Sequence, residues 1–172
     1  MNRRRFLQTG AAAAAALSVT SCSRSRTKWR FFTDREGRTL AALCDQIVPP
    51  DHYPGAAAAG AVEFLDRQLL RHYRKHRAAY RDGLARTDQL GLTRFGRTFA
   101  DLSVAQQNDL AHTLEHDQGA FFELVLNHTM QSFYGSPRHG GNRDAVSWRM
   151  LGIPDPPVRG RAIYDVGKPV QS

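Results

Sequence analysis

The stretch TDREGRTLAALCDQIVPP, residues 33–50, decides the fold class. It opens with a capping box, in which the Thr33 hydroxyl and the Glu36 carboxylate satisfy backbone N–H groups that a new helix leaves unpaired. Apolar residues then recur at helical spacing on one face, and two prolines end the pattern; these apolar residues are Leu40, Cys44 and Ile47. The stretch therefore predicts an amphipathic helix that ends near Val48.

Three further helices are expected along the chain. One runs from near Ala57 to about Leu84, with an apolar stripe of Val62, Leu65, Leu69, Tyr73, His76, Tyr80 and Leu84. A capping box at Ser103 and Gln106 opens another helix, which ends near Asp117, and Gly119 leads into an apolar helix that follows. No alternating strand of five or more residues is evident. The predicted fold is all-α, a small bundle of about four helices with a Gly/Pro-rich extended C-terminal tail.

Composition excludes most redox and nucleotide enzymes. The chain has 172 residues, 41% hydrophobic content and a formal net charge of +8, which is ordinary for one globular domain apart from the basic balance. Two cysteines exclude a disulfide-dense scaffold, a four-cysteine zinc site and an iron–sulfur cluster held by cysteines alone. The sequence has no Cys-x-x-Cys-His, no G-x-G-x-x-G and no Walker loop. No cofactor is therefore expected on this chain.

The first 21 residues have the three-part form of an export signal. A basic start is followed by a short alanine-rich run and a small-residue end, and no acid lies among these residues. Arg3 and Arg4, with Phe6 and Leu7 close behind, resemble the twin-arginine signal for exporting folded proteins. The alternative is a basic amphipathic surface helix.

Cys22 follows a stretch that resembles a lipobox, Val19-Thr-Ser-Cys22, in which the cysteine becomes the lipidated first residue of the mature chain. Val19 and Ser21 also fit ordinary cleavage, and both alternatives cut before Cys22. Residues 22–32 are then a short polar tether. Cys44 is left as the remaining thiol, and its place on an apolar helix face predicts a buried small hydrophobe.

A metal site is one hypothesis for His112, Glu115 and His116. These residues match the H-x-x-E-H pattern, in which two imidazoles four residues apart bind a metal and the glutamate acts as a base. A third protein ligand would have to come from elsewhere, and solvated helix histidines are the alternative.

A basic stripe follows the second expected helix, made of Arg67, Arg71, Arg74, Lys75, Arg77 and Arg81. It is interpreted as a solvated face, or as a contact for an acidic partner or lipid head groups. Nucleic acid is not an expected partner, because an exported protein meets little of it and the interleaved tyrosines fall on the core side.

The segment after the apolar helix is a candidate partner contact. Gly140, Gly141 and Asn142 all tolerate positive φ and imply a sculpted bend, which Trp148 is expected to fix on the helical body. The alternative is a helix C-cap plus a turn. The candidate contact residues are Tyr134, Arg138, His139, Asn142 and Trp148.

Several blocks of the chain together resemble the gluconate 2-dehydrogenase subunit 3 family. They span residues 40 to 152 in the family's order, and the block from Gly140 to Trp148 is the most specific. The blocks are residues 40–51, Gly55-Ala56, 61–66, 99–103, Gln106-Gln107, Phe133-Tyr-Gly-Ser-Pro137, Gly140-Gly-Asn142 and Trp148. The family usually continues into a Gly-rich tail, where this chain has Ile153-Pro-Asp-Pro-Pro157.

The resemblance implies a non-catalytic small subunit of a membrane-associated, FAD-dependent sugar or alcohol dehydrogenase. In that family the large subunit carries the flavin and a cytochrome c subunit commonly takes the electrons. The small subunit would bear the signal, so that the flavoprotein is exported folded alongside it to the periplasm and held at the membrane through Cys22. The alternative is a stand-alone periplasmic lipoprotein metalloenzyme using His112, Glu115 and His116.

The expected organisation is therefore a signal peptide over residues 1–21, a tether over 22–32, a helical domain over 33–152 and a tail over 153–172. The tail's apolar residues are sparse, so it cannot offset its own ordering entropy by burial. We expect it to extend across the flavoprotein subunit.

Overall fold

The computed structural model describes residues 28–153. The predicted signal residues Arg3, Arg4, Phe6 and Leu7, the predicted lipidation site Cys22 and the tail from residue 154 lie outside the described residues. Within residues 28–153 the structure is all-α, as predicted, and contains no strand.

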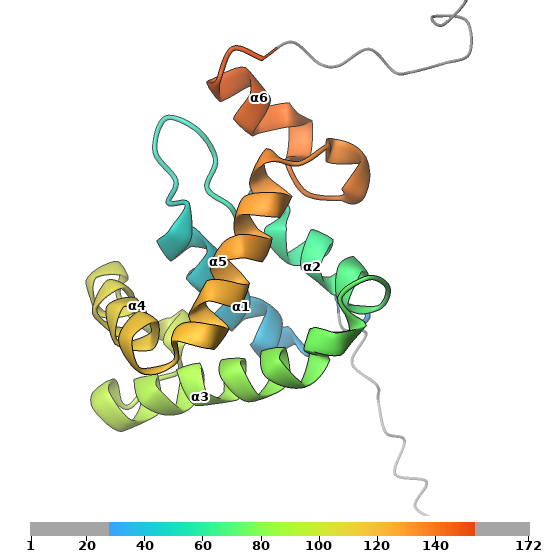
Figure 1. Cartoon of the computed structure of the whole chain (residues 1–172). Coiled ribbons are helices and arrows are strands. Elements are labelled where there is room, and N and C mark those ends of the chain that lie inside the picture. The colour runs from blue at the N-terminus through green and yellow to red at the C-terminus, as the bar shows by residue number, and fades with distance from the viewer. Residues whose placement is uncertain (1–27, 154–172) are drawn as a thin grey trace, which may run out of the picture.

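Six α-helices form the described part, more than the four or so expected. They are α1 (Asp34–Ile47), α2 (Ala61–Leu69), α3 (Arg77–Phe95), α4 (Val104–Asp117), α5 (Gly119–Tyr134) and α6 (Val146–Met150). Four short 3-10 helices join them: η1 (Arg74–His76), η2 (Phe99–Asp101), η3 (Pro137–His139) and η4 (Arg143–Ala145). Figure 1 shows α5 at the centre, α4 and α2 on either side of it, α3 along the bottom and α6 at the top.

Helix α1 is the centre of the core. It packs against α2, α3, α4 and α5, and its Leu40, Leu43 and Cys44 side chains are fully buried. The predicted capping box is present, because Thr33 accepts from the Glu36 N–H and the Glu36 carboxylate accepts from the Thr33 N–H. The second predicted capping box, at Ser103, also forms and begins α4. Local sequence signals therefore set the start of both helices.

The long second helix predicted from Ala57 to Leu84 is wrong. The chain turns through residues 57–60, begins α2 at Ala61, leaves the helix after Leu69 and resumes with α3, which continues to Phe95. Backbone groups freed by the break find partners within the turn: the Tyr73 N–H donates to the Gln68 carbonyl (2.8 Å) and Arg77 Nε donates to the Leu69 carbonyl (2.7 Å). The break lets α2 and α3 bury different faces, with Leu69 and Tyr80 both fully buried.

Residues 135–152 contain three short helical segments joined by turns, within the range expected for the helical domain. The chain forms η3, η4 and α6 there, and α6 packs against α5. Among residues 28–153, no helix is both long enough and apolar enough to cross a bilayer.

Candidate interaction site at the end of α5

Asn142 organises the loop between α5 and α6. Its side chain is fully buried, its Nδ2 donates to the Gly135 carbonyl (2.8 Å) and its Oδ1 accepts from the Ser147 N–H (3.0 Å). Both ends of one amide thus join the end of α5 to the beginning of α6. The bend that Trp148 was expected to fix is therefore held by Asn142.

The two glycines before Asn142 are required for different reasons. Gly140 has φ +98°, a conformation that side chains with a Cβ rarely adopt. Gly141 lies against α5 so closely that an added Cβ would be 2.5 Å from the Ser132 carbonyl oxygen. The first glycine is needed for backbone conformation, and the second is needed for close approach.

The loop holds three residues other than glycine in the left-handed region. Asn142, Asp144 and Ala145 have φ values of 46°, 56° and 52°. Each such residue costs on the order of 1–2 kcal/mol, and alanine has no side-chain hydrogen bond to offset it. Contacts with the turn before α2 hold the loop in place: the Arg143 N–H donates to the Ala59 carbonyl (2.8 Å) and Arg143 Nη1 donates to the Ala58 carbonyl (3.1 Å). Strain held in this way clusters at functional sites.

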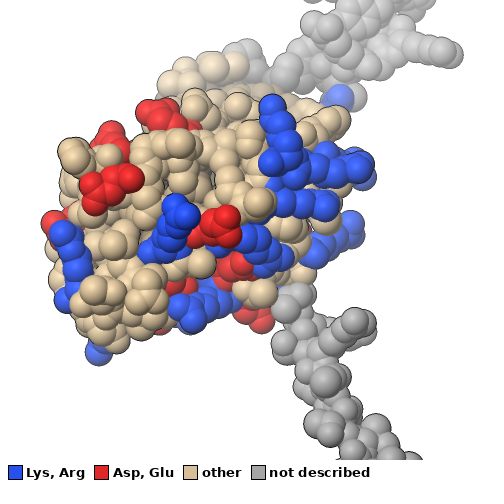
Figure 2. Space-filling model, turned by 60° about the horizontal axis from the view of Figure 1, so that its bottom comes forward, with Lys and Arg blue, Asp and Glu red and all other residues tan. Residues whose placement is uncertain are grey.

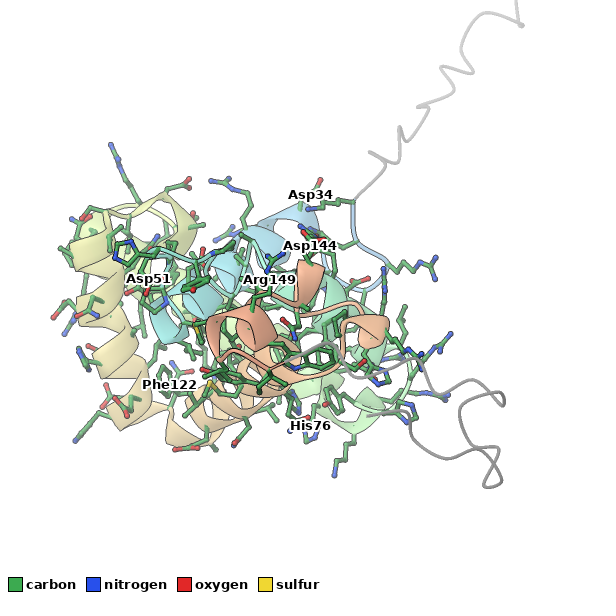
Figure 3. All side chains as sticks on the ribbon, turned by 90° about the horizontal axis from the view of Figure 1, so that it is seen from above. Asp34, Asp51, His76, Phe122, Asp144 and Arg149 are labelled. Carbon is green, nitrogen blue, oxygen red and sulfur yellow. The ribbon has the colours of Figure 1, made fainter. Side chains whose placement is uncertain are left out.

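Apolar side chains are exposed beside this loop. Trp148 is partly buried and donates its Nε1–H to the Tyr134 carbonyl (3.1 Å), which joins α6 to the last turn of α5. Figure 3, seen from the α6 side, shows Arg149 of α6 on the near surface. We call the following set the α5/α6 patch: Met130, Tyr134, Trp148, Leu151 and Ile153. Four of its members are 38–55% exposed, and the Trp148–Tyr134 hydrogen bond brings the two helices of the patch together.

The five predicted contact residues do not form one surface. Tyr134 and Trp148 belong to the α5/α6 patch, and Asn142 is inside the protein. Arg138 and His139 are exposed on η3, where they line a cleft of about 560 Å³ together with the beginning of the described chain and the end of α2.

The predicted metal ligands point into solvent. The side chains of His112 and His116 are 73% and 88% exposed. His112 Nδ1 lies 3.7 Å from a Glu115 oxygen, whereas His116 Nδ1 lies 2.8 Å from Asp117 Oδ1. Within residues 28–153 no three His, Cys, Asp or Glu side chains are grouped to hold a metal ion. The third ligand that this hypothesis requires is therefore not supplied by the described part of the chain.

The basic stripe is divided by the break between α2 and α3. Arg77 and Arg81 are partly buried and lie over Phe31, with their guanidinium carbons 5.7 and 4.5 Å from the centre of its ring. Arg81 also donates to the Phe31 carbonyl and pairs with Glu36. The other members of the stripe, Arg67, Arg71, Arg74 and Lys75, remain exposed. Arg77 and Arg81 are thus partly solvated and engaged within the chain, whereas the expectation was a solvated face.

An aromatic and histidine cluster lies between α3 and α5. His128 is 5% exposed, its ring stacks on Tyr73 with the ring centres 4.0 Å apart, and its Nδ1 is 3.0 Å from the Tyr80 hydroxyl. Burial, reinforced by His76, lowers the pKa of His128 to about 4. Burial also raises the pKa of the Cys44 thiol to about 12, in agreement with the predicted inert core cysteine.

The pKa of His128 predicts a pH-dependent stability. Unfolded histidine has a pKa near 6.5, so between pH 6.5 and 4 the unfolded chain binds a proton that the folded chain does not. Acidification through that window should therefore lower the free energy of unfolding, by up to about 3 kcal/mol from this residue alone. Urea unfolding at pH 7 and pH 4.5 measures the loss. This loss of unfolding free energy should be smaller in His128→Asn and unchanged in the exposed control His112→Asn. An equal loss in both variants would contradict the assignment to His128.

Asp66 fixes the chain before α1 and was not identified from the sequence. It is 4% exposed and accepts hydrogen bonds from the N–H groups of Arg30 (2.9 Å), Phe31 (2.8 Å) and Phe32 (3.1 Å). The available signal was an acid at an otherwise buried position of an apolar helix face, because a carboxylate there needs several donors. This contact fixes residues 30–32 against α2.

Comparison with known proteins identifies one family. The sequence model of the family described as gluconate 2-dehydrogenase subunit 3 matches residues 34–154, from the beginning of α1 to just beyond α6. No curated protein and no solved structure matches the chain.

Proposed function

The chain belongs to the gluconate 2-dehydrogenase subunit 3 family, and from this membership we propose that it is the non-catalytic small subunit of an exported, FAD-dependent sugar or alcohol dehydrogenase. In this proposal a large subunit carries FAD and oxidises the substrate. A cytochrome c subunit accepts the electrons. The small subunit supports export, maturation and membrane association of the flavoprotein.

The structural observation that supports a partner-binding role is the α5/α6 patch beside the strained loop. A lone domain gains nothing in stability from exposed Tyr134, Leu151 and Ile153, whereas burial against a partner removes this apolar area from water. Tyrosine and tryptophan are also the residue types that dominate interface energies. We therefore assign the patch to the flavoprotein large subunit, which the family membership implies as a partner.

The amino-terminal residues supply the proposed route and anchor. Arg3 and Arg4 with Phe6 and Leu7 would address the folded complex to the twin-arginine route, and Cys22 would carry the lipid that holds it at the periplasmic face of the membrane. Several acyl chains on one cysteine anchor stably, because each buried methylene contributes about 0.8 kcal/mol.

Co-purification tests the assignment of the patch. Replacing Tyr134 and Leu151 by Ser should reduce the flavoprotein recovered with the tagged small subunit by about tenfold or more, because a tyrosine at the centre of an interface contributes about 2 kcal/mol when it is a hot spot. Flavin absorbance and the band of the large subunit measure recovery from the native host.

The matched control replaces two exposed apolar residues elsewhere, Leu92 (40% exposed) and Val104 (74%), by Ser. Recovery equal to the control in the patch variant would place the interface elsewhere. A wild-type chain that brings down no flavoprotein at all would refute the proposed function itself.

A further inference from the structure

A basic cleft lies where the described chain begins, between residues 28–30, the end of α2 and η3. Its volume is about 560 Å³. The basic lining, which defines the basic cleft, consists of Lys28, Arg30, Arg67, Arg71 and Arg138, with His139 beside them. Figure 2 shows Lys and Arg side chains gathered along one side of the molecule.

The acids of the cleft are already engaged by other groups. Asp66 is satisfied by three backbone N–H groups, and Glu63 pairs with Lys28 (3.2 Å) and Arg143 (3.4 Å). The four arginines that line the cleft form no ion pair with any acid among residues 28–153. They are Arg30, Arg67, Arg71 and Arg138. Guanidinium groups without a carboxylate partner are suited to bind phosphate or carboxylate oxygens from outside the chain.

The position of the cleft favours a membrane surface over another protein as the source of those oxygens. Cys22 precedes Lys28 by six residues, which reach at most about 22 Å whatever their conformation. This step rests on the proposed lipidation of Cys22. A lipidated Cys22 keeps the cleft near the headgroups, and attraction between charges acts over a Debye length of about 8–10 Å at physiological salt.

We propose that the basic cleft binds the headgroups of anionic phospholipids and so sets the orientation of the small subunit on the membrane. No member of the α5/α6 patch lines the cleft, so the two surfaces share no residue. Lipid contact therefore uses none of the residues assigned to the flavoprotein contact.

Vesicle flotation tests the proposal without the flavoprotein. The probe is the full mature chain with Cys22→Ser, so that no acyl chain contributes to binding. It is mixed with vesicles of phosphatidylcholine alone or with 30 mol% phosphatidylglycerol, at about 50 and 300 mM salt. We expect binding to the phosphatidylglycerol vesicles that weakens at the higher salt concentration.

The variant Arg30→Gln/Arg71→Gln should bind these vesicles about twenty-fivefold more weakly, at about fivefold for each of the two cations lost. Its matched control is Arg86→Gln/Arg97→Gln, which removes the same charge from exposed positions in the middle of α3 and just after its end, outside the cleft lining, and should bind as the parent does. The charge-preserving Arg30→Lys/Arg71→Lys should also bind as the parent does. Its binding would show that the glutamine variant binds weakly because charge is lost, and not because substitution at these positions disturbs the fold.

Three results would overturn the proposal. The first is equal binding of the parent to vesicles with and without phosphatidylglycerol. The second is an equal loss of vesicle binding in the cleft variant and the control variant. The third is vesicle binding by Arg30→Gln/Arg71→Gln as strong as that of the parent, together with reduced recovery of the flavoprotein. The last result would assign the cleft to an acidic segment of the partner. Failure of the proposed function is a separate result, because the flavoprotein is absent from the flotation assay.

Discussion

Gly141→Ala is expected to lower the free energy of unfolding by about 3 kcal/mol, with a fall in melting temperature of about 10 °C. The reason is the approach of the loop to α5, where the added Cβ would lie 2.5 Å from the Ser132 carbonyl oxygen. That oxygen belongs to helical backbone and cannot rotate away, so the loop has to move instead. Movement strains the buried hydrogen bonds of Asn142 with Gly135 and Ser147, each of which is costly to leave unmade.

Gly119→Ala is the matched control for this substitution. Gly119 is the first residue of α5, has no atom within 4 Å of an added Cβ and should accept alanine with a change of less than about 0.5 kcal/mol. Denaturant unfolding of the two variants measures the difference, and flavoprotein co-purification should fall only for Gly141→Ala. Equal stability of the two would mean that the loop does not pack on α5 as described.

Local chemistry was sufficient to predict where α1 and α4 begin. Thr33 with Glu36 and Ser103 with Gln106 are three residues apart, and each pair satisfies helix N–H groups without help from the rest of the fold. Such signals can be recognised in a sequence because every participating group lies within one turn.

The break between α2 and α3 could not be predicted in this way. Residues 70–76 contain neither glycine nor proline, and their spacing continues the helical pattern. What ends α2 is the tertiary structure: Tyr73 leaves the helical path and stacks on His128, 55 residues further along the chain. Tertiary contacts such as this one override helix propensity, and a contact between residues so far apart cannot be recognised from the local sequence.

The loop after α5 was predicted as a bend, but the roles of its residues were assigned differently. Gly140 and Asn142 do adopt positive φ, as expected. Asp144 and Ala145 also do so; aspartate is one of the residue types that tolerate this region, whereas alanine gives no such signal. The residues predicted as one partner contact lie on different surfaces, because Arg138 lines a cleft whose other residues are distant in sequence. Patterns along the chain do not contain that information.

Replacing Arg3, Arg4 and Arg5 together by Lys is expected to abolish export of the small subunit and to leave the flavoprotein in the cytoplasm with it. The charge is preserved, so a purely electrostatic role of the signal would survive the change. A receptor that recognises arginine would not accept lysine, because the planar guanidinium offers five donors in a fixed fork whereas the ammonium group is a compact point charge. All three positions must change, since Arg3-Arg4 and Arg4-Arg5 both offer an arginine pair.

Cell fractionation with immunodetection measures this loss, and intact mass should show the wild-type mature chain beginning at an acylated Cys22. The matched control carries Arg24→Lys, Arg26→Lys and Arg30→Lys, which are three identical substitutions beyond the proposed cleavage site, and it should be exported normally. Normal export of the Arg3, Arg4 and Arg5 variant would refute the twin-arginine hypothesis. Export of the flavoprotein without the small subunit would show instead that the flavoprotein has its own export signal. The role proposed for this chain would then be limited to holding the complex at the membrane.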